Sequence, residues 1–318
     1  MRVGVSNPFC WPEVRRGGER LQHELCAHLA GRGHDVTLVA SAPAGREDAA
    51  EAPPGVARAV VGRRFDRLAF RHHWTPGHEF HFRARGLFRA ADFGAVHALG
   101  YFDAAAALAS RGRGARPRVV AQSIGIPMRR MFRTAPIDRW LFARTLREAD
   151  RFAVLSTHVQ RVVEREFGRR AVVLPPPVDI SAFPVRAPGP ARPVILYSGS
   201  VDEPRKGVDL LLAAFETLLE TVPDAELRLT GQCSHARATA LRTSLGARAA
   251  ERLSIHGPGR VADLPQLYRD AGVLVLPSRF EAFGLVLVEA MASGTPVVAA
   301  REGGASDILG GPETGELV

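Results

Sequence analysis

Short apolar runs alternate with longer helical patterns along almost the whole sequence, once before Pro175 and again after Pro193. This alternation is typical of parallel β-sheets whose strands are connected by helices. Between the two series lies a cluster of seven prolines, at positions 175, 176, 177, 184, 188, 190 and 193. Proline fixes φ and lacks an N–H group, so neither a helix nor a central strand can run through this cluster. The sequence therefore predicts two doubly wound α/β domains, at 1–178 and 193–318, joined by a linker at 179–192.

The expected elements follow from the apolar periodicity. In the first domain we expect strands at 3–6, 35–40, 95–99, 118–122, 152–155 and 171–174, and helices at 18–29, 79–91, 102–110, 137–148 and 157–167. In the second we expect strands at 194–197, 226–230, 253–256, 273–276 and 296–299, and helices at 207–221, 235–249, 262–270 and 284–292. Domains of this type bind ligands at the carboxyl ends of their strands.

Charge is distributed unevenly along the chain. Residues 1–190 contain 30 basic and 17 acidic side chains, whereas residues 191–318 contain 12 and 16. The basic first half favours an anionic partner, such as nucleic acid, a membrane surface or a phosphorylated substrate. Solubility in an arginine-rich composition is the alternative explanation. Of the 42 cationic residues, 41 are arginine, and Lys206 is the single lysine.

The cysteines and the hydropathy pattern bear on the cellular location. Cys10, Cys26 and Cys233 are far apart in the sequence and form no Cys-x-x-Cys pair. This usage is typical of a reduced, cytosolic chain. The N-terminus lacks the apolar core of a signal peptide, and no apolar run reaches the length of a transmembrane helix. We therefore expect a cytoplasmic protein, with peripheral attachment to the inner face of the membrane as a further option.

The segment PSRFEAFGLVLVEAMASGTPVVAA, residues 277–300, carries the most specific chemistry. A buried strand ends at Pro277, and a helix is expected to begin near Phe283 and Gly284. Free N–H groups at a helix start suit a phosphate, and glycine lets a ligand approach the backbone. Glu281 and Glu289 are eight residues apart, about 12 Å along a helix. Two carboxylates beside a phosphate suggest a ligand with hydroxyl groups, whereas the alternative is two structural glutamates.

EAFGLVLVE resembles the Glu-x7-Glu motif of the family-4 retaining glycosyltransferases. Other segments are similar to the same family in the same order: VRRGGERLQHELCAHLAGRGHDVTLVAS, ADRFAVLS, VVLPPPVDISAF, YSGSVDEPRKGVDLLLAAF and HGPGRVADLPQLYRDAGVLVLPS. The resemblance implies the GT-B fold, in which two Rossmann-like domains face each other across a cleft. It also implies an acceptor-binding N-terminal domain, a C-terminal domain that binds a UDP- or GDP-sugar, transfer with retention, and no metal or other cofactor.

The resemblance assigns donor-binding roles in the C-terminal domain. Arg205 and Lys206 would stabilise the departing diphosphate, because cations favour the charge that develops there. Glu281 would hold the sugar and Glu289 the ribose. Three further donor-binding candidates are Phe283, Gly284 and Leu285, whose backbone amides would contact the donor. Arg260 is a candidate because it lies in the segment that lines the base. Ser200 is a candidate because it stands where the family usually has arginine. An ordinary basic helix start is the alternative for Arg205 and Lys206.

Candidates in the N-terminal domain are less specific. Gly17 and Gly18 match the family's Gly-Gly loop and could bring backbone amides to the donor, although such a pair is also an ordinary loop feature. The family frequently has a catalytic histidine after the strand at 118–122. Gln122 or Ser123 occupies that place here, and His97 at the end of an earlier strand is a neighbouring candidate, with a core histidine as the alternative.

The sequence was also searched for metal sites, other catalytic motifs and nucleic-acid-binding modules, and it contains arginine-rich segments that could bind anions. His78, Glu79 and His81 are one residue short of the His-Glu-x-x-His zinc pattern, so no metal is expected. No Gly-x-Ser-x-Gly, Walker A or Gly-x-Gly-x-x-Gly sequence occurs, which argues against hydrolases, NTPases and dehydrogenases. Arginines alternate with apolar residues at 63–74 and 128–146, which could bind anionic lipid or a phosphorylated acceptor; a solvated face is the alternative. No nucleic-acid recognition module is visible, so we expect no nucleic-acid partner.

We therefore interpret the chain as a glycosyltransferase with a lipid-linked, cell-envelope or small-molecule acceptor. Two alternatives remain: a non-catalytic GT-B partner or membrane-surface protein, and a sugar-nucleotide epimerase of the same fold. Ser200 and Ser123 favour the first alternative, since each stands where the family usually has a functional residue. The chain also ends at Val318, earlier than expected from the family.

Overall fold

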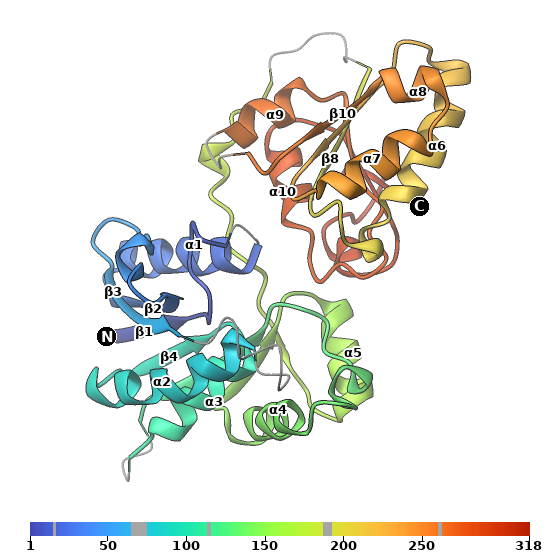
Figure 1. The fold of residues 1–318 in the computed structure, drawn as a ribbon. Helices are drawn as coiled ribbons and strands as arrows, with labels where there is room; N and C mark the ends of the chain where they lie inside the picture. Colours follow the sequence, from blue (N-terminus) through green and yellow to red (C-terminus); the bar gives the residue numbers. More distant parts are fainter. Residues whose placement is uncertain (15–16, 65–74, 113–115, 187–192, 260–262) are drawn as a thin grey trace. The chain divides into compact units, whose positions relative to one another are not determined.

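The computed structural model describes residues 1–318 except 15–16, 65–74, 113–115, 187–192 and 260–262. The chain forms two compact units, Met1–Pro177 and Val178–Val318 (Figure 1). Each unit contains one parallel sheet with helices packed on it, which confirms the predicted α/β fold with two sheets.

The first unit contains a seven-stranded sheet in the order β3-β2-β1-β4-β5-β6-β7. Its strands are β1 (Arg2–Ser6), β2 (Asp35–Pro43), β3 (Ala57–Arg63), β4 (Ala95–Ala98), β5 (Arg118–Ser123), β6 (Arg151–Val154) and β7 (Val172–Val173). Its α-helices are α1 (Gly17–Gly31), α2 (Pro76–Ala90), α3 (Tyr101–Ser110), α4 (Pro136–Glu148) and α5 (Thr157–Phe167). Val3 in β1 pairs with Val36 on one side and Ala95 on the other, so β1 is a buried central strand.

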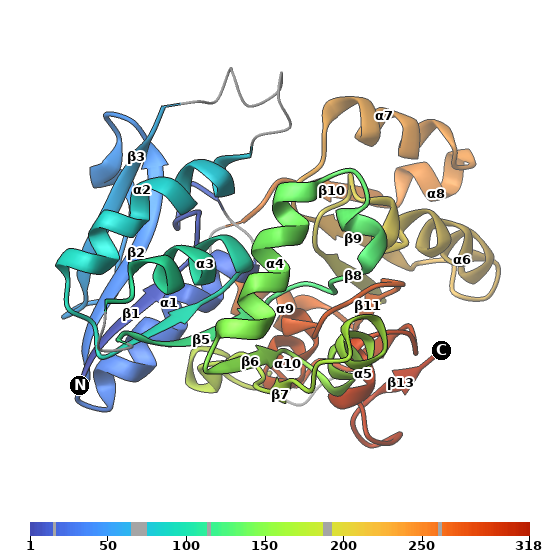
Figure 2. The same ribbon diagram turned by 90° about the horizontal axis from the view of Figure 1, so that it is seen from below.

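Local sequence explains where these elements begin and end. Ser156 caps α5 by accepting a hydrogen bond from the Val159 N–H, and Gly168 ends the helix with a φ of 65°. Such caps satisfy N–H groups that the helix leaves free. In Figure 1, α1 covers one face of the sheet, whereas α2 and α3 cover the other. Helix α4 packs beside α3 (Figure 2).

The second unit has a six-stranded sheet in the order β10-β9-β8-β11-β12-β13. Its strands are β8 (Val194–Ser198), β9 (Glu226–Thr230), β10 (Leu253–His256), β11 (Val273–Leu276), β12 (Val297–Ala299) and β13 (Glu316–Leu317). Its α-helices are α6 (Val208–Thr221), α7 (His235–Thr243), α8 (Ala247–Glu251), α9 (Leu264–Asp270) and α10 (Leu285–Ala292). Leu196, Leu227 and Leu274 are completely buried on its central strands.

Three features of the second unit differ from the sequence-based expectation, the first of which is the additional strand β13. The helix expected at 235–249 is divided into α7 and α8, because Gly246 caps α8 and donates its N–H to Glu216 Oε1 at 2.8 Å. Residues 179–186, expected in the linker, pack on the second unit. Phe183 is buried in its core, and the Arg186 N–H donates to the Ser293 carbonyl at 3.0 Å.

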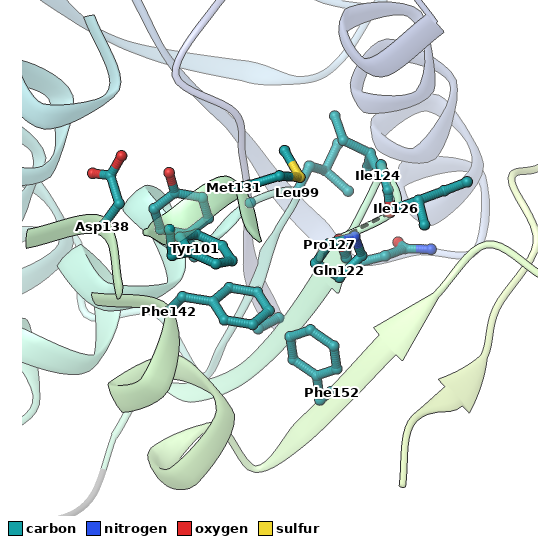
Figure 3. Close-up of a pocket in the computed structure, with 15 residues that line it drawn as sticks. Leu99, Tyr101, Gln122, Ile124, Ile126, Pro127, Met131, Asp138, Phe142 and Phe152 are labelled. Atoms are coloured by element: carbon teal, nitrogen blue, oxygen red, sulfur yellow. Dashed lines mark hydrogen bonds between the residues drawn. The ribbon is translucent and has the colours of Figure 1, made fainter. Parts of the chain in front are cut away.

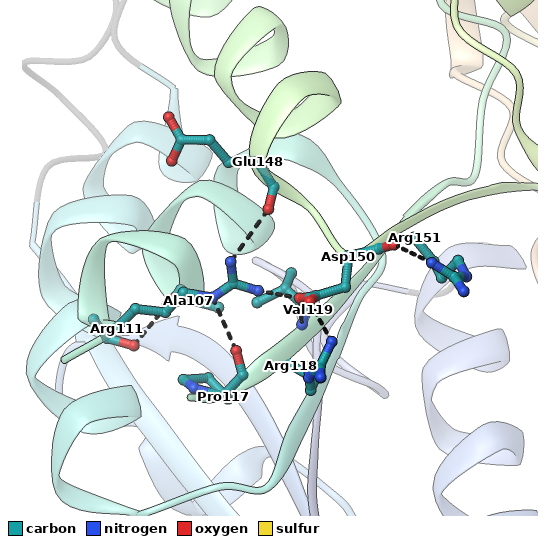
Figure 4. Close-up of polar contacts among 9 residues, drawn as sticks. Ala107, Arg111, Pro117, Arg118, Val119, Glu148, Asp150 and Arg151 are labelled. Carbon is teal, nitrogen blue, oxygen red and sulfur yellow. Dashed lines mark hydrogen bonds and ion pairs between the residues drawn. The ribbon is translucent and has the colours of Figure 1, made fainter. Parts of the chain in front are cut away.

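A polar network lies at the amino ends of β5 and β6 (Figure 4). Asp150 accepts hydrogen bonds from the Val119 N–H at 2.8 Å and from Arg118 Nη1 at 3.1 Å, and it pairs with Arg111. Arg111 also donates from Nε to the Pro117 carbonyl at 3.0 Å. Burial alone would raise the pKa of Asp150, but the amide and the two guanidinium groups together lower it.

We expect Asp150→Asn to destabilise the first unit by about 2 kcal/mol at neutral pH, because it weakens charge-assisted hydrogen bonds. A carboxylate with a lowered folded-state pKa contributes stability above its unfolded pKa, and that contribution is lost as pH falls through the folded value. The difference in stability between the two proteins should therefore shrink as the pH falls below 3.8, the ordinary pKa of aspartate. Urea unfolding across acidic and neutral pH measures this. A difference that stays constant with pH would contradict the electrostatic explanation.

Candidate functional site

The loops that follow β8 and β11 meet at the carboxyl edge of the second sheet. The loop after β8 contains a short 3₁₀ helix, η5 (Pro204–Lys206), which leads into α6. Gly207 joins them with a φ of 71°, and a Cβ there would approach the Pro277 carbonyl oxygen closer than 3.0 Å. The Arg279 N–H donates to the Arg205 carbonyl at 3.0 Å. Glycine therefore allows a close backbone contact between the two loops that carry the predicted donor residues.

This contact brings Lys206 and Glu281 together. Lys206 Nζ lies 2.7 Å from Glu281 Oε2, and the two side chains are only 15% and 16% exposed. The neighbouring Arg205 is half exposed and donates from Nη1 to the Phe280 carbonyl at 3.0 Å. Its other terminal nitrogen lies 2.6 Å from Glu203. The charge of Lys206 is thus held by a partly buried carboxylate, whereas that of Arg205 is more exposed to water.

Two glycines after β12 hold the backbone of Glu281 in place. Gly303 forms a parallel bridge with Glu281, and the Gly304 N–H donates to the Glu281 carbonyl at 2.8 Å. Gly303 has a φ of 112°, and a Cβ there would lie 2.6 Å from that carbonyl oxygen. A Cβ at Gly304 would lie 2.5 Å from the Ala282 carbonyl oxygen. Larger residues would push the loop that carries Glu281 away from β12.

Helix α10 begins directly after this loop. Gly284 is its N-cap residue, with a φ of 106° and no side chain to bond the first N–H groups. Phe283 and Leu285 flank it and are partly buried. The helix start therefore offers the positive end of its dipole close in sequence to Glu281, as expected for an anion site.

The second glutamate of the motif lies on the buried side of the same helix. Glu289 is 1% exposed, and its Oε2 accepts a hydrogen bond from Tyr268 Oη at 2.6 Å. Tyr268 is itself buried, and its carbonyl accepts a hydrogen bond from Thr295 Oγ1 at 2.7 Å. The carboxylate is therefore held by a tyrosine from α9, which the sequence analysis does not identify.

The other two donor candidates of the second unit are Ser200 and Arg260. Ser200 follows β8, and its carbonyl accepts a hydrogen bond from Tyr197 Oη at 3.0 Å. The Ser200 side chain is partly exposed. Arg260 lies outside the described residues.

In the first unit, Gln122 of β5 links His97 of the neighbouring strand β4 to the carbonyl of Leu174, which follows β7. His97 Nε2 lies 2.7 Å from Gln122 Oε1, and Gln122 Nε2 donates to the Leu174 carbonyl at 2.7 Å. Both ends of the Gln122 amide are thus engaged. Burial lowers the pKa of His97 and so favours the neutral form of its imidazole. Ser123 Oγ donates to the Gly125 carbonyl at 3.1 Å.

The Gly-Gly pair lies near the same edge of the first sheet. Gly17 is the first residue of α1, and Gly18 follows it. A Cβ at Gly18 would lie 2.5 Å from Cδ1 of Ile124, in the loop that follows Ser123. The structure therefore brings Gly18 next to the loop that directly follows the candidates Gln122 and Ser123 at the end of β5.

A cavity of about 320 Å³ opens beside these residues (Figure 3). Aromatic and aliphatic side chains line most of it, with Asp138 and Tyr101 at one end and Gln122 at the other. Asp138 Oδ1 lies 2.6 Å from His78 Nε2. In the sequence, the apolar bulk of the segment at 128–146 is the one feature that points to this cavity.

The histidines considered for a metal have other partners. His78 contacts Asp138 and Thr75, and His81 Nδ1 lies 3.1 Å from the Phe102 carbonyl. Burial lowers the pKa of His81. Within the described ranges, no group of three potential metal ligands is present. Among the helices that the structure describes, none combines the length and apolar character needed to cross a membrane.

Comparison with known proteins relates both units to sugar-transferring enzymes. The family described as "Glycosyltransferase Family 4" matches residues 15–182, and "Glycosyl transferases group 1" matches residues 192–318. A phosphatidyl-myo-inositol mannosyltransferase of Mycobacterium tuberculosis is 37% identical over 156 residues, which are 48% of this chain and 40% of that protein. The matched stretch is thus less than half the length of such curated relatives.

Solved structures show the same fold. Sucrose-phosphate synthase from Thermosynechococcus elongatus aligns with a TM-score of 0.81 at 20% identity, covering 100% of this chain and 86% of the other. Anabaena HepE in complex with UDP-glucose aligns with a TM-score of 0.75 at 19% identity, covering 100% and 85%. These likenesses confirm the expected GT-B type of α/β fold with two Rossmann-like sheets.

Proposed function

Because this chain belongs to the family 4 glycosyltransferases, we propose that it transfers a sugar from a nucleoside diphosphate donor to an acceptor hydroxyl. The observation that carries this proposal is the Lys206–Glu281 pair at 2.7 Å, beside the glycine that begins α10. It places one cation, one carboxylate and a helix start in adjacent loops of one sheet edge.

The pair suits the junction between a sugar and a diphosphate. An ammonium group has three N–H donors, and Lys206 uses one of them on Glu281. The other two are available for phosphate oxygens, whose negative charge increases as the glycosidic bond breaks. The amides at the start of α10 add a fixed positive potential. Arg205 supplies a second, more mobile cation.

In this proposal, Glu281 and Glu289 accept hydrogen bonds from hydroxyl groups of the donor. Glu281, fixed by Lys206 and by the two glycines after β12, accepts hydrogen bonds from the sugar. Glu289, oriented by Tyr268, accepts from the ribose. Fixing both carboxylates before the donor binds reduces the ordering cost of binding. No metal ion has a part in this scheme, because Lys206, Arg205 and the helix start supply the positive charge.

The nucleotide is the first component to test. We expect UDP or GDP to raise the unfolding temperature, since a ligand at 100 times its dissociation constant adds about 2.7 kcal/mol of stability. Thermal unfolding with each nucleotide, and with its sugar conjugates, measures this. Glu281→Gln should keep most of the stabilisation by the free nucleotide but lose the extra stabilisation by the sugar. Failure of every nucleotide diphosphate to stabilise the protein would contradict the proposal.

Turnover then separates transfer from its alternatives. We propose retention of the anomeric configuration, which NMR of the glycosylated product would report. The Gln122 amide stands where the family frequently has a catalytic histidine, and both its ends are engaged within the first unit. This observation favours a non-catalytic GT-B partner as the second candidate. Nucleotide binding without donor hydrolysis or transfer would support that candidate, and sugar isomers formed without an acceptor would indicate an epimerase.

A further inference from the structure

A positively charged and partly apolar surface lies on the first unit, beside the cavity of Figure 3. It is formed by η3 (Arg129–Phe132) and the first turns of α4, which contact each other. We call it the docking surface and define it by its exposed side chains: Arg130, Met131, Arg133, Ile137, Arg139 and Trp140.

The charge of this surface is not neutralised locally. Residues 128–148 contain six arginines and two acids, of which Asp138 faces His78 and Glu148 pairs with Arg144 at 2.9 Å. Arg130, Arg133 and Arg139 are exposed and form no ion pair with any residue in the described part of the chain. An anionic partner would therefore gain attraction here without first displacing an acidic side chain.

The apolar members of the surface point to a lipid rather than to a fully aqueous partner. Met131 is 62% exposed and Trp140 is 54% exposed. Ile137 and Trp140 are three residues apart on α4 and so share a helix face. Arg144 lies over the Trp140 ring, with its guanidinium carbon 5.7 Å from the ring centroid. Tryptophan and arginine side by side are typical of segments that lie at a membrane interface.

The cavity continues this surface inwards. Met131 belongs to both, because it is exposed and also lines the cavity. Phe132 and Phe142 stack with their ring centroids 4.8 Å apart and form an apolar wall. The polar side chains that line the cavity already have partners: Gln122 bonds His97 and Leu174, Ser123 bonds Gly125, and Tyr101 and Asp138 bond each other. The occupant that matches such a lining is apolar.

We propose that this face binds an anionic phospholipid bilayer, with the docking-surface arginines on lipid phosphates and one acyl chain reaching into the cavity. The inference does not depend on the proposed transferase activity, because it concerns lipid binding alone.

Vesicle flotation tests the electrostatic part. The protein is mixed with vesicles of phosphatidylcholine, with or without phosphatidylglycerol. We expect partitioning only with phosphatidylglycerol, and a decrease at high salt. Arg133→Glu with Arg139→Glu should lower the partition coefficient at least about tenfold, since each basic residue near an anionic surface contributes on the order of 1 kcal/mol. The control variant is Arg32→Glu with Arg89→Glu, which makes the same charge change at the exposed ends of α1 and α2. It should lower the partition coefficient by no more than about twofold.

Calorimetry with lysophosphatidylglycerol tests the cavity. Ile126 lines the cavity, whereas Ile137 is exposed on α4. Ile126→Trp should fill the space and weaken binding about tenfold, but Ile137→Trp should not weaken it. Brominated acyl chains should quench the tryptophan fluorescence of the unaltered protein, and most of this quenching should be lost in Trp140→Phe, which keeps Trp11 and Trp74. Equal partitioning with and without phosphatidylglycerol would overturn the proposal. Binding of soluble glycerol phosphate as tightly as lysophosphatidylglycerol would also overturn it and would indicate a phosphorylated soluble ligand.

Discussion

Replacing Lys206 by alanine is expected to lower turnover by about 10²–10³-fold with the cognate sugar nucleotide. The ammonium is the partly buried cation beside Glu281, and the charge it faces is largest as the diphosphate departs. Because this interaction strengthens towards the transition state, the loss should appear mainly in kcat rather than in KM. Steady-state kinetics with the donor identified by thermal stabilisation measures it.

Two companion variants make this result specific. Lys206→Arg keeps a cation but changes its shape, and it should recover only part of the lost rate, since a guanidinium cannot replace a compact ammonium at a close contact. Arg248→Ala removes an exposed cation from α8 of the same unit and should leave turnover within about twofold. Equal rates for Lys206→Ala and Arg248→Ala would refute the role of Lys206.

The pairing with Glu281 predicts non-additivity. Lys206→Ala leaves the Glu281 carboxylate, which is only 16% exposed, without its cation. Part of the single-variant loss therefore comes from an unpaired, partly desolvated charge. Adding Glu281→Gln should cost less in the Lys206→Ala background than in the unaltered protein. A double-variant cycle thus measures how much of the effect belongs to the pair.

The closeness of Lys206 and Glu281 can be explained from local features of the sequence. Lys206 is the single lysine in the chain, and Glu281 lies in the loop before a glycine-started helix. The two residues follow β8 and β11, which are neighbours in one parallel sheet. Parallel strands bring their carboxyl ends to the same edge, so residues 75 positions apart become contacts once the sheet is recognised.

Other features depend on packing that leaves no local pattern. The Tyr268–Glu289 bond requires α9 and α10 to lie side by side, and neither residue's type indicates the other. The cavity likewise is lined by residues of separate elements, among them Tyr101 of α3, Gln122 of β5 and Asp138 of α4. Strand β3 was not expected, because its residues are mostly half buried at a sheet edge and its arginines interrupt the apolar pattern. The positions of edge strands and cavities depend on how distant elements pack, which the apolar periodicity of one segment does not indicate.

Replacing Gly231 by alanine is expected to destabilise the second unit by about 4 kcal/mol. Gly231 has a φ of 134°, a conformation that only glycine adopts readily, and it directly follows β9. A Cβ there would overlap the Gly199 carbonyl oxygen, closer than 3.0 Å. The Gly231 N–H also donates to the His256 carbonyl at 3.1 Å, so the residue cannot move away without breaking that bond.

Gly257, one residue past β10, is the matched control for this change. A Cβ at Gly257 meets nothing within 4 Å, and its φ is not in the left-handed range. Gly257→Ala should therefore change the free energy of unfolding by no more than about 0.5 kcal/mol. Urea unfolding followed by circular dichroism compares the two. If Gly231→Ala were as stable as Gly257→Ala, the close contact between the loops after β8 and β9 would be wrong. That approach accompanies two hydrogen bonds between the same loops, from the Gly199 N–H to the Thr230 carbonyl at 2.9 Å and from the Val201 N–H to the Gln232 carbonyl at 2.8 Å, so a displaced Gly231 would also disturb the start of the loop that leads to Lys206.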